Sequence, residues 1–289
     1  MTSGAAEGDC WTGDDPVGAM AAAAAAAADG VRAALRHISD QLGVSVPSVP
    51  GWSGELGREV DLDLHLLKSS QNLGDVEVVS GGAITNAALF ALLRVPDVGA
   101  DVRVIEPDTY GTSNLNRYAL GRRSQVDLPK VDILTSFGND HIPVGGLTRR
   151  LDETFAAELG PLARNVLVGV DHIPSRWIAQ RHAPGLVVVG STSHDFVVVS
   201  AHPSHGPCAG CTDPRDDSGT GEIPTISFVS FWAGLLQALD LVRYARYPDR
   251  GACRTEQYPL RLDRRRGLWV YPQAPSPKFP MLCSASLAA

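Results

Sequence analysis

The sequence predicts an α/β protein with a Rossmann-like, doubly wound and mainly parallel sheet, an N-terminal helical extension and a cysteine-containing C-terminal tail. Three observations lead to this prediction. Short runs of Val, Leu and Ile alternate with helix-forming segments, a pair of glycines follows the first run of the core, and an acidic residue ends the next run. Strand, helix and strand at this spacing indicate parallel strands joined by right-handed crossovers.

The composition already excludes several classes of protein. The 289 residues are enough for one large domain with an appendage. A net charge of −7 argues against a nucleic-acid partner, which needs a basic face. No convincing apolar run reaches the ~20 residues of a membrane span, and the first 20 residues lack the basic segment of a signal peptide. We therefore expect a cytoplasmic protein without a membrane partner, and the odd number of cysteines, five, argues against a disulfide framework.

Residues 1–70 are expected to form an extension that consists of a disordered leader, an alanine-rich helix and a linker. The helix is predicted over 16–42, because alanine is the best helix former. Val31, Leu35 and Ile38 recur at helical spacing, which predicts that one stripe of this helix is buried. In the linker, residues 59–67 alternate apolar and polar side chains like a half-buried strand.

A nucleotide-binding domain is predicted over 71–289. It begins with a strand at 76–80, which is followed by the turn Gly81-Gly82 and by a helix at 86–95. The other expected elements are strands at 102–106, 165–171, 186–191 and 196–202, and helices at 174–182 and within 223–246.

The turn after the first strand has part of a phosphate-binding pattern. A glycine turn between a strand and a helix directs backbone N–H groups toward a phosphate. The pattern G-x-G-x-x-G places Ser80, Gly82 and Thr85 at its glycine positions, so one of the three glycines is present. Glu106 follows Gly82 by 24 residues, close to the ~20 expected for a carboxylate that binds a ribose hydroxyl. A tight turn without a ligand and an acid that caps the next helix are the structural alternatives.

The segment after Glu106 is far more specific. Residues 105–120, IEPDTYGTSNLNRYAL, resemble the D-x-D and S-N-L-N-R-Q signature of the ThiF/MoeB and ubiquitin-activating enzyme superfamily. Over residues 73–286 further segments are similar to this superfamily in consistent order: Leu128-Pro129-Lys130 to its lysine segment, Asp171 to its magnesium-binding aspartate, residues 206–214 to its first zinc CxxC and residues 223–245 to the long helix after it.

This resemblance implies ATP-dependent adenylation of a C-terminal carboxylate, with release of pyrophosphate. The acceptor would be a ubiquitin-like or sulfur-carrier protein or a small peptide, and the enzyme would be a homodimer. The resemblance implies catalytic roles for Arg117, Lys130 and Asp171, with Asp171 binding Mg²⁺. The residues it implies for ATP binding are Gly81, Gly82, Glu106, Asp108, Asn114, Arg117 and Lys130.

A structural zinc ion is a further expectation. Cys208 and Cys211 have the spacing of half a tetrahedral zinc site, in a segment whose flanking residues indicate a surface loop. By the resemblance Cys283 is a third ligand, while Ser286 stands where the fourth cysteine is expected. Candidates for the fourth ligand are Cys253, His202 and His205, and an empty, degenerate site is the alternative. Cys253 is also a candidate nucleophile for a thioester.

Two other functions remain open from the sequence. Ser80, Thr85 and Ser286 depart from the pattern of the superfamily, which is compatible with a non-catalytic ThiF-like scaffold or partner-binding protein that has lost part of its ATP site. The strand, helix and strand with Glu106 are also compatible with a nicotinamide-dependent oxidoreductase. The segment SNLNR argues against that second alternative, because a dehydrogenase has no use for a phosphate-binding Asn and Arg there.

Overall fold

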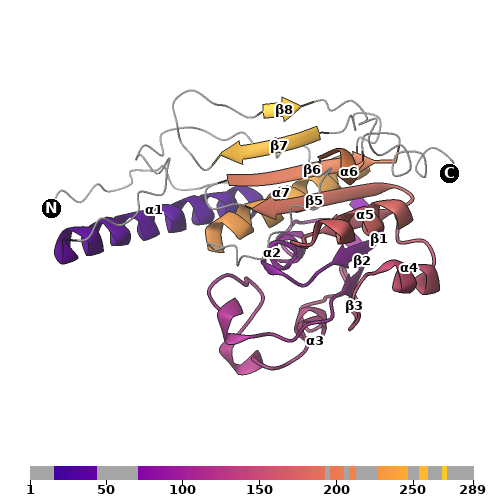
Figure 1. The fold of residues 1–289 in the computed structure, drawn as a ribbon, viewed down its shortest axis with the longest axis horizontal. Helices are drawn as coiled ribbons and strands as arrows, with labels where there is room; N and C mark the ends of the chain where they lie inside the picture. Colours follow the sequence, from indigo (N-terminus) through magenta and orange to yellow (C-terminus); the bar gives the residue numbers. More distant parts are fainter. Residues whose placement is uncertain are drawn as a thin grey trace.

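The computed structural model has one sheet with helices on both faces and a long N-terminal helix that extends beyond the body (Figure 1). It describes residues 16–43, 71–192, 196–204, 208–212, 227–246, 254–259 and 269–271.

The described strands form one eight-stranded sheet in the order β3-β2-β1-β4-β5-β6-β7-β8. Neighbouring strands from β3 to β5 pair in parallel, and β6, β7 and β8 continue the sheet in antiparallel pairs. The mainly parallel core that the sequence predicts is therefore confirmed. The strands are β1 (Gln71–Val79), β2 (Val98–Ile105), β3 (Val144–Leu147), β4 (Asn165–Val168), β5 (Leu186–Thr192), β6 (Phe196–Pro203), β7 (Arg254–Pro259) and β8 (Trp269–Tyr271).

The sheet is covered on both faces, as a doubly wound fold requires. Successive strand residues point to opposite faces, and here Val78 belongs to one hydrophobic core while Val79 belongs to the other. The first core is covered by α1 (Pro16–Leu42), α2 (Ala83–Leu92), α3 (Lys130–Thr135) and α7 (Ser227–Arg246). The second is covered by α4 (Glu153–Leu159), α5 (Ile173–His182) and α6 (Ala209–Thr212).

The predicted elements agree with the observed ones except at their ends. The helix at 16–42 has the predicted bounds, whereas β1 begins at Gln71, five residues before the predicted start. Helix α2 begins at Ala83 rather than at 86, since Gly82 is its N-cap. The sequence did not predict the short elements α3, β3 and α4. The half-buried strand predicted at 59–67 lies outside the described residues.

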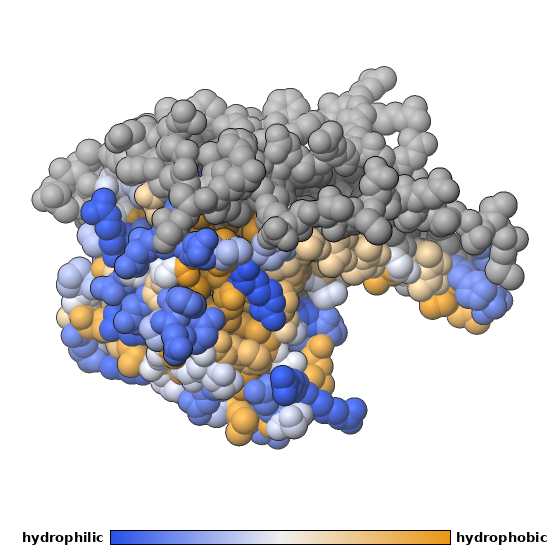
Figure 2. All heavy atoms as spheres, turned by 180° about the vertical axis from the view of Figure 1, so that it is seen from behind, coloured by the Kyte–Doolittle hydropathy of each residue, from blue (hydrophilic) through white to orange (hydrophobic). Residues whose placement is uncertain are grey.

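Helix α1 packs on the body through its first half only. Val17, Met20, Ala21 and Ala24 are buried in the core that α1 shares with α7. The second half extends away from the body (Figures 1 and 2), and Val31, Ile38 and Leu42 on it are exposed. The side chain of Leu35 lies outside the described residues. The predicted burial is therefore wrong for Val31 and Ile38, because the helix is longer than the surface on which it packs. Within the described ranges, none of the helices has both the length and the apolar character needed to cross a bilayer.

Gly234 allows α7 to pack closely on α2. A Cβ atom at this position would lie 2.3 Å from the carbonyl oxygen of Ile84 and 2.6 Å from Ala87 Cβ. We expect Gly234→Ala to destabilise the protein by about 3 kcal/mol, because the two backbones have to separate. Gly30→Ala is the control, since a Cβ at Gly30 in α1 has no neighbour within 4 Å. It should stabilise the protein by about 0.5–1 kcal/mol through helix propensity, and denaturant unfolding measures both.

Candidate nucleotide-binding site

A pocket of about 300 Å³ lies at the carboxyl ends of the parallel strands. It is bordered by residues that follow β1, β2 and β4, where the strand order reverses between β1 and β4. In doubly wound sheets ligands bind at such a reversal point. The predicted site residues that line this pocket are Gly82, Glu106, Asp108, Asn114, Arg117, Lys130 and Asp171. Segments up to 89 residues apart in the sequence are thus brought to one place.

Glu106 is held in position by two backbone donors. Gly81 N–H donates to Glu106 Oε2 at 2.5 Å, and Asp108 N–H donates to Oε1 at 2.9 Å. The side chain is 3% exposed, and a Cβ at Gly81 would lie 3.1 Å from Glu106 Cγ. Gly81 therefore supports the pocket indirectly, through the carboxylate, rather than by lining it.

The two missing glycines of the turn are replaced without loss of its geometry. Ser80 adopts a φ of 89°, in the left-handed region that favours glycine. Thr85 is buried, and its hydroxyl donates to Ser80 O at 2.6 Å. Its methyl group packs against Gly169, where an added Cβ would lie 2.7 Å from Thr85 Cγ2. A glycine at position 85 would allow α2 to lie close to the end of β4. With Thr85 at that position, Gly169 after β4 provides the space instead.

This exchange of partners can be tested by two substitutions. Gly169→Ala should destabilise the protein by about 1–3 kcal/mol, because the new Cβ overlaps Thr85 Cγ2. Adding Thr85→Ser removes that methyl group and retains the hydroxyl that binds Ser80 O, so the double variant should recover at least half of the loss. Urea unfolding of the two single variants and the double variant measures the coupling. Additive losses would show that the two residues do not compensate each other.

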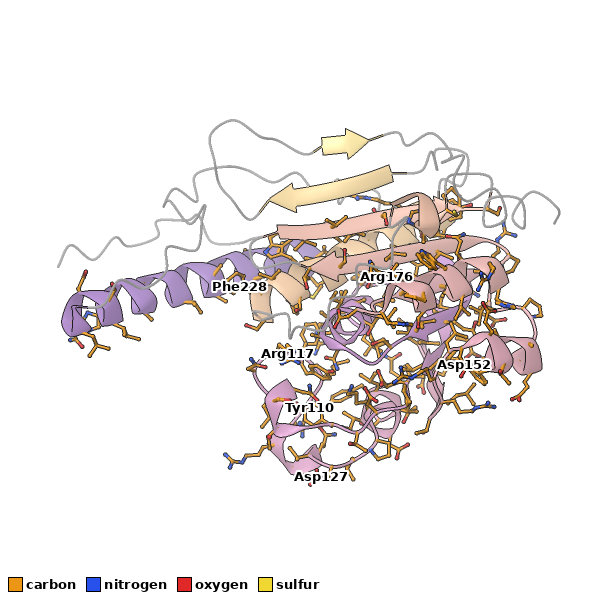
Figure 3. The ribbon with its side chains drawn as sticks, in the orientation of Figure 1. Tyr110, Arg117, Asp127, Asp152, Arg176 and Phe228 are labelled. Carbon is orange, nitrogen blue, oxygen red and sulfur yellow. The ribbon has the colours of Figure 1, made fainter. Side chains whose placement is uncertain are left out.

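The loop between β2 and α3 is closed at its base and carries six of the pocket residues. Lys130 N–H donates to Asp108 O at 3.0 Å, which brings the two ends of the loop together. Leu120 N–H donates to the buried side chain of Asn86 at 2.7 Å, which ties the loop to α2. Figure 3 shows Arg117 on the side of this loop nearer the sheet. Asn114, Arg117 and Tyr118 therefore line the pocket from a fixed loop.

Lys130 forms the centre of a charged cluster in the pocket. Its ammonium lies 3.2 Å from Asp108 Oδ2 and 3.7 Å from Glu106 Oε1. Burial alone would lower the pKa of Lys130, but Tyr118, Glu106 and Asp108 together raise it above the usual value. The pKa of Tyr118 is raised as well. Here burial is the cause, and the charge of Lys130 opposes it. Lys130 is consequently a cation at neutral pH, placed where a phosphate can meet it.

Asn114 and Arg117 have structural partners within the loop. Asn114 Oδ1 accepts from Gly111 N at 2.8 Å, which caps the short 3₁₀ turn at Thr112–Asn114. Arg117 Nη1 donates to Ser113 O at 2.6 Å and to Asn116 Oδ1 at 3.0 Å. These bonds hold the guanidinium at the pocket, and its remaining N–H groups are compatible with a phosphate ligand.

Asp171 follows β4 and is exposed at the rim of the pocket. Among the described residues, none forms a hydrogen bond or an ion pair with its carboxylate. Mg²⁺ prefers one or two carboxylates together with oxygens of the substrate. The exposed carboxylate of Asp171 at the rim of the pocket fits this preference.

The sequence did not identify Arg150 as a pocket residue. Arg150 lines the pocket from the segment after β3, a strand that was not predicted. Its neighbour Arg149 is used elsewhere: it pairs with Glu158 at 2.8 Å and lies 4.3 Å from the centre of the Phe155 ring. In the sequence, Arg150 could be noticed only as one of two adjacent arginines after an apolar stretch. Its place at the pocket follows from strand β3, which precedes it.

The zinc expectation remains a prediction. Cys208 itself is buried, whereas residues 206–207 and 213–214, on which the prediction of a surface loop depends, lie outside the described residues, as do Cys253 and His205. The side chain of Cys211 and the whole of Cys283 lie outside the described residues. His202 is also buried, with its Nε2 2.8 Å from Ser200 Oγ. Within the part of the chain that is described, no three His, Cys, Asp or Glu side chains are grouped as metal ligands.

Comparison with solved structures supports the fold. The chain is similar to E. coli MccB solved with ATP, with a TM-score of 0.58, 18% identity and coverage of 75% of this chain and 67% of MccB. The Microcin C7 biosynthetic enzyme MccB in complex with N-formylated MccA gives a TM-score of 0.57 and 17% identity over 75% and 68% of the two chains. PaaA gives a TM-score of 0.51 and 14% identity, over 73% of this chain and 66% of PaaA. No family model matches the chain, and no curated protein matches it. The α/β fold expected from the sequence is therefore one that this chain shares with MccB.

Proposed function

We propose that this protein uses ATP to adenylate the C-terminal carboxylate of a peptide or of a ubiquitin-like or sulfur-carrier protein. The observation that carries the proposal is the convergence of Glu106, Asn114, Arg117, Lys130 and Asp171 on one pocket at the reversal point of the sheet. These residues provide a hydrogen-bond acceptor for the ribose, a side-chain amide, two cations and a carboxylate ligand for Mg²⁺.

Each of these pocket residues would bind a different part of ATP. Glu106, fixed at the end of β2, would accept from a ribose hydroxyl. Gly82, the N-cap of α2, lines the pocket, so the N-terminus of this helix would stabilise the charge of a phosphate. Arg117 and Lys130 would hold the charge of the triphosphate. Asp171 would hold Mg²⁺, which when bound neutralises phosphate charge.

The reaction needs accurate positioning more than covalent help from the protein. An oxygen of the substrate carboxylate attacks the α-phosphorus, an oxygen–phosphorus bond forms, and the bond to the β-phosphate breaks to release pyrophosphate. Lys130 and Arg117 would stabilise the charge that accumulates on the leaving group. The closed loop that carries Arg117 holds it at the pocket before the substrate binds, which lowers the cost of reorganisation.

The structural comparison favours a peptide among the possible acceptors. MccB, with which this chain shares its fold, has been solved both with ATP and with MccA. The acceptor proposed here is accordingly a peptide chain with a free C-terminal carboxylate, and the homodimer implied by the resemblance is part of the same proposal.

The products of ATP distinguish this proposal from its alternatives. With Mg²⁺, ATP labelled in the α-phosphate and a pool of synthetic peptides with free C-terminal carboxylates, we expect labelled peptidyl adenylate and pyrophosphate. The same peptides with amidated C-termini should remain unlabelled. Formation of ADP and phosphate would indicate a different phosphoryl transfer. ATP binding without turnover of any peptide in the pool would favour the non-catalytic alternative.

A further inference from the structure

Ser80 has an unusual backbone conformation at the edge of the pocket. Its φ of 89° lies in a region that residues other than glycine seldom adopt. Such strain persists where the surroundings hold it, and it occurs preferentially at functional sites. Ser80 occupies the first glycine position of the phosphate-binding pattern, where glycine would adopt this φ without strain.

The hydroxyl of Ser80 connects the two halves of the nucleotide site. Ser80 Oγ accepts from Gly82 N–H at 2.9 Å, at the N-terminus of α2, which is proposed to face a phosphate. The same hydroxyl lies 3.4 Å from Glu106 Oε2 and donates toward it. Gly81 N–H donates to that same carboxylate oxygen. One side chain thus lies between the phosphate-binding turn and the carboxylate proposed to bind the ribose.

We propose that Ser80 is a positioning residue that sets the orientation of Glu106 toward the ribose, through its hydroxyl. This inference rests on the proposed ATP site. The carboxylate has two oxygens, and Oε1 is held by Asp108 N–H and lies near Lys130. Oε2 is held from the turn, by Gly81 and Ser80. Removal of the hydroxyl leaves Oε2 with Gly81 N–H as its donor, so the orientation of the carboxylate is held by fewer hydrogen bonds.

The test compares ATP with 2′,3′-dideoxyATP, which lacks both ribose hydroxyls. Calorimetric titration of the wild-type protein should show about tenfold or greater preference for ATP, as expected for hydrogen bonds to a charged group. Ser80→Ala should reduce that preference about threefold or more. Ser80→Gly should reduce it equally, although glycine removes the backbone strain and should raise the melting temperature.

The opposite effects of the two variants on stability separate positioning from general damage. If the preference followed stability, Ser80→Gly would retain or increase it, and this result would overturn the inference. Thr85→Val is the matched control in the same turn. It removes a hydroxyl that binds Ser80 O and Gly82 O but does not contact Glu106. It should weaken the binding of both nucleotides alike and leave their ratio unchanged.

The failure of this inference can be distinguished from the failure of the proposed function. If the wild-type protein binds neither nucleotide, the proposed ATP site itself is wrong. If it binds both equally, Glu106 does not read the ribose and the inference falls with that assignment. If it prefers ATP and both Ser80 variants keep the full preference, the proposed function stands and Ser80 is not its positioning residue.

Discussion

Replacing Lys130 with Ala should reduce the rate of adenylation by about 100- to 1000-fold, the range found when a single group that stabilises transition-state charge is removed. The side chain of Lys130 is 11% exposed, and its ammonium lies beside both Glu106 and Asp108. Without it, two carboxylates face the incoming triphosphate with no cation between them. The substitution should therefore weaken ATP binding as well as slow the reaction, and steady-state release of pyrophosphate measures both effects.

The dependence on pH gives an additional check on Lys130. Because its neighbours raise the pKa of Lys130 above the usual value of 10.5, the ammonium keeps its proton as the pH rises from 7 to about 9. No loss of ATP binding should come from Lys130 in this range. Arg149→Ala is the control for charge, since Arg149 pairs with Glu158 outside the pocket. A Lys130→Ala variant whose rate stays within about threefold of the wild type would exclude Lys130 from the reaction.

Replacing Asp171 with Asn should lower the rate by a similar factor, about 100-fold or more, with little change in stability. Asparagine has the same shape but lacks the charge that a Mg²⁺ ligand provides. The side chain is exposed at the pocket rim, so the free energy of unfolding should change by no more than about 0.5 kcal/mol. The variant should also need a higher Mg²⁺ concentration for half of its maximal rate, which a titration of pyrophosphate release with MgCl₂ measures.

Asp152 provides a control with the opposite behaviour. Its carboxylate accepts from Phe155 N–H at 2.8 Å and caps α4, and it does not line the pocket (Figure 3). Asp152→Ala should cost about 1 kcal/mol of stability through the lost cap and leave the adenylation rate unchanged. If Asp171→Asn behaves like Asp152→Ala, the assignment of Asp171 to Mg²⁺ is wrong.

The sequence predicted the elements whose signal is local. The alanine content fixes the bounds of α1, and the buried runs of Val and Leu identify β1, β2, β4 and β5 because both faces of these strands are covered. The resemblance over residues 73–286 was enough to expect Glu106, Lys130 and Asp171 in one ATP site. Their convergence follows from the parallel topology and not from any one motif.

What the sequence did not predict depends on contacts between distant residues. The strand β3 has four residues, two of them glycine, and it is defined by its pairing with β2. Arg150 could not be assigned to the pocket without that strand. Thr85 departs from the glycine of the phosphate-binding pattern, and its compensation by Gly169 was not visible in the sequence because Gly169 lies 84 residues away. The exposed half of α1 reflects the size of the body, which the helix pattern does not encode.

Calorimetric titration of ATP with Mg²⁺ into the wild-type protein and the Lys130→Ala variant tests most directly whether this pocket is an ATP site. We predict one binding site per chain in the wild-type protein and binding at least tenfold weaker in the variant. An absence of binding to the wild-type protein, or equal affinity in the two proteins, would contradict the assignment of the pocket to ATP.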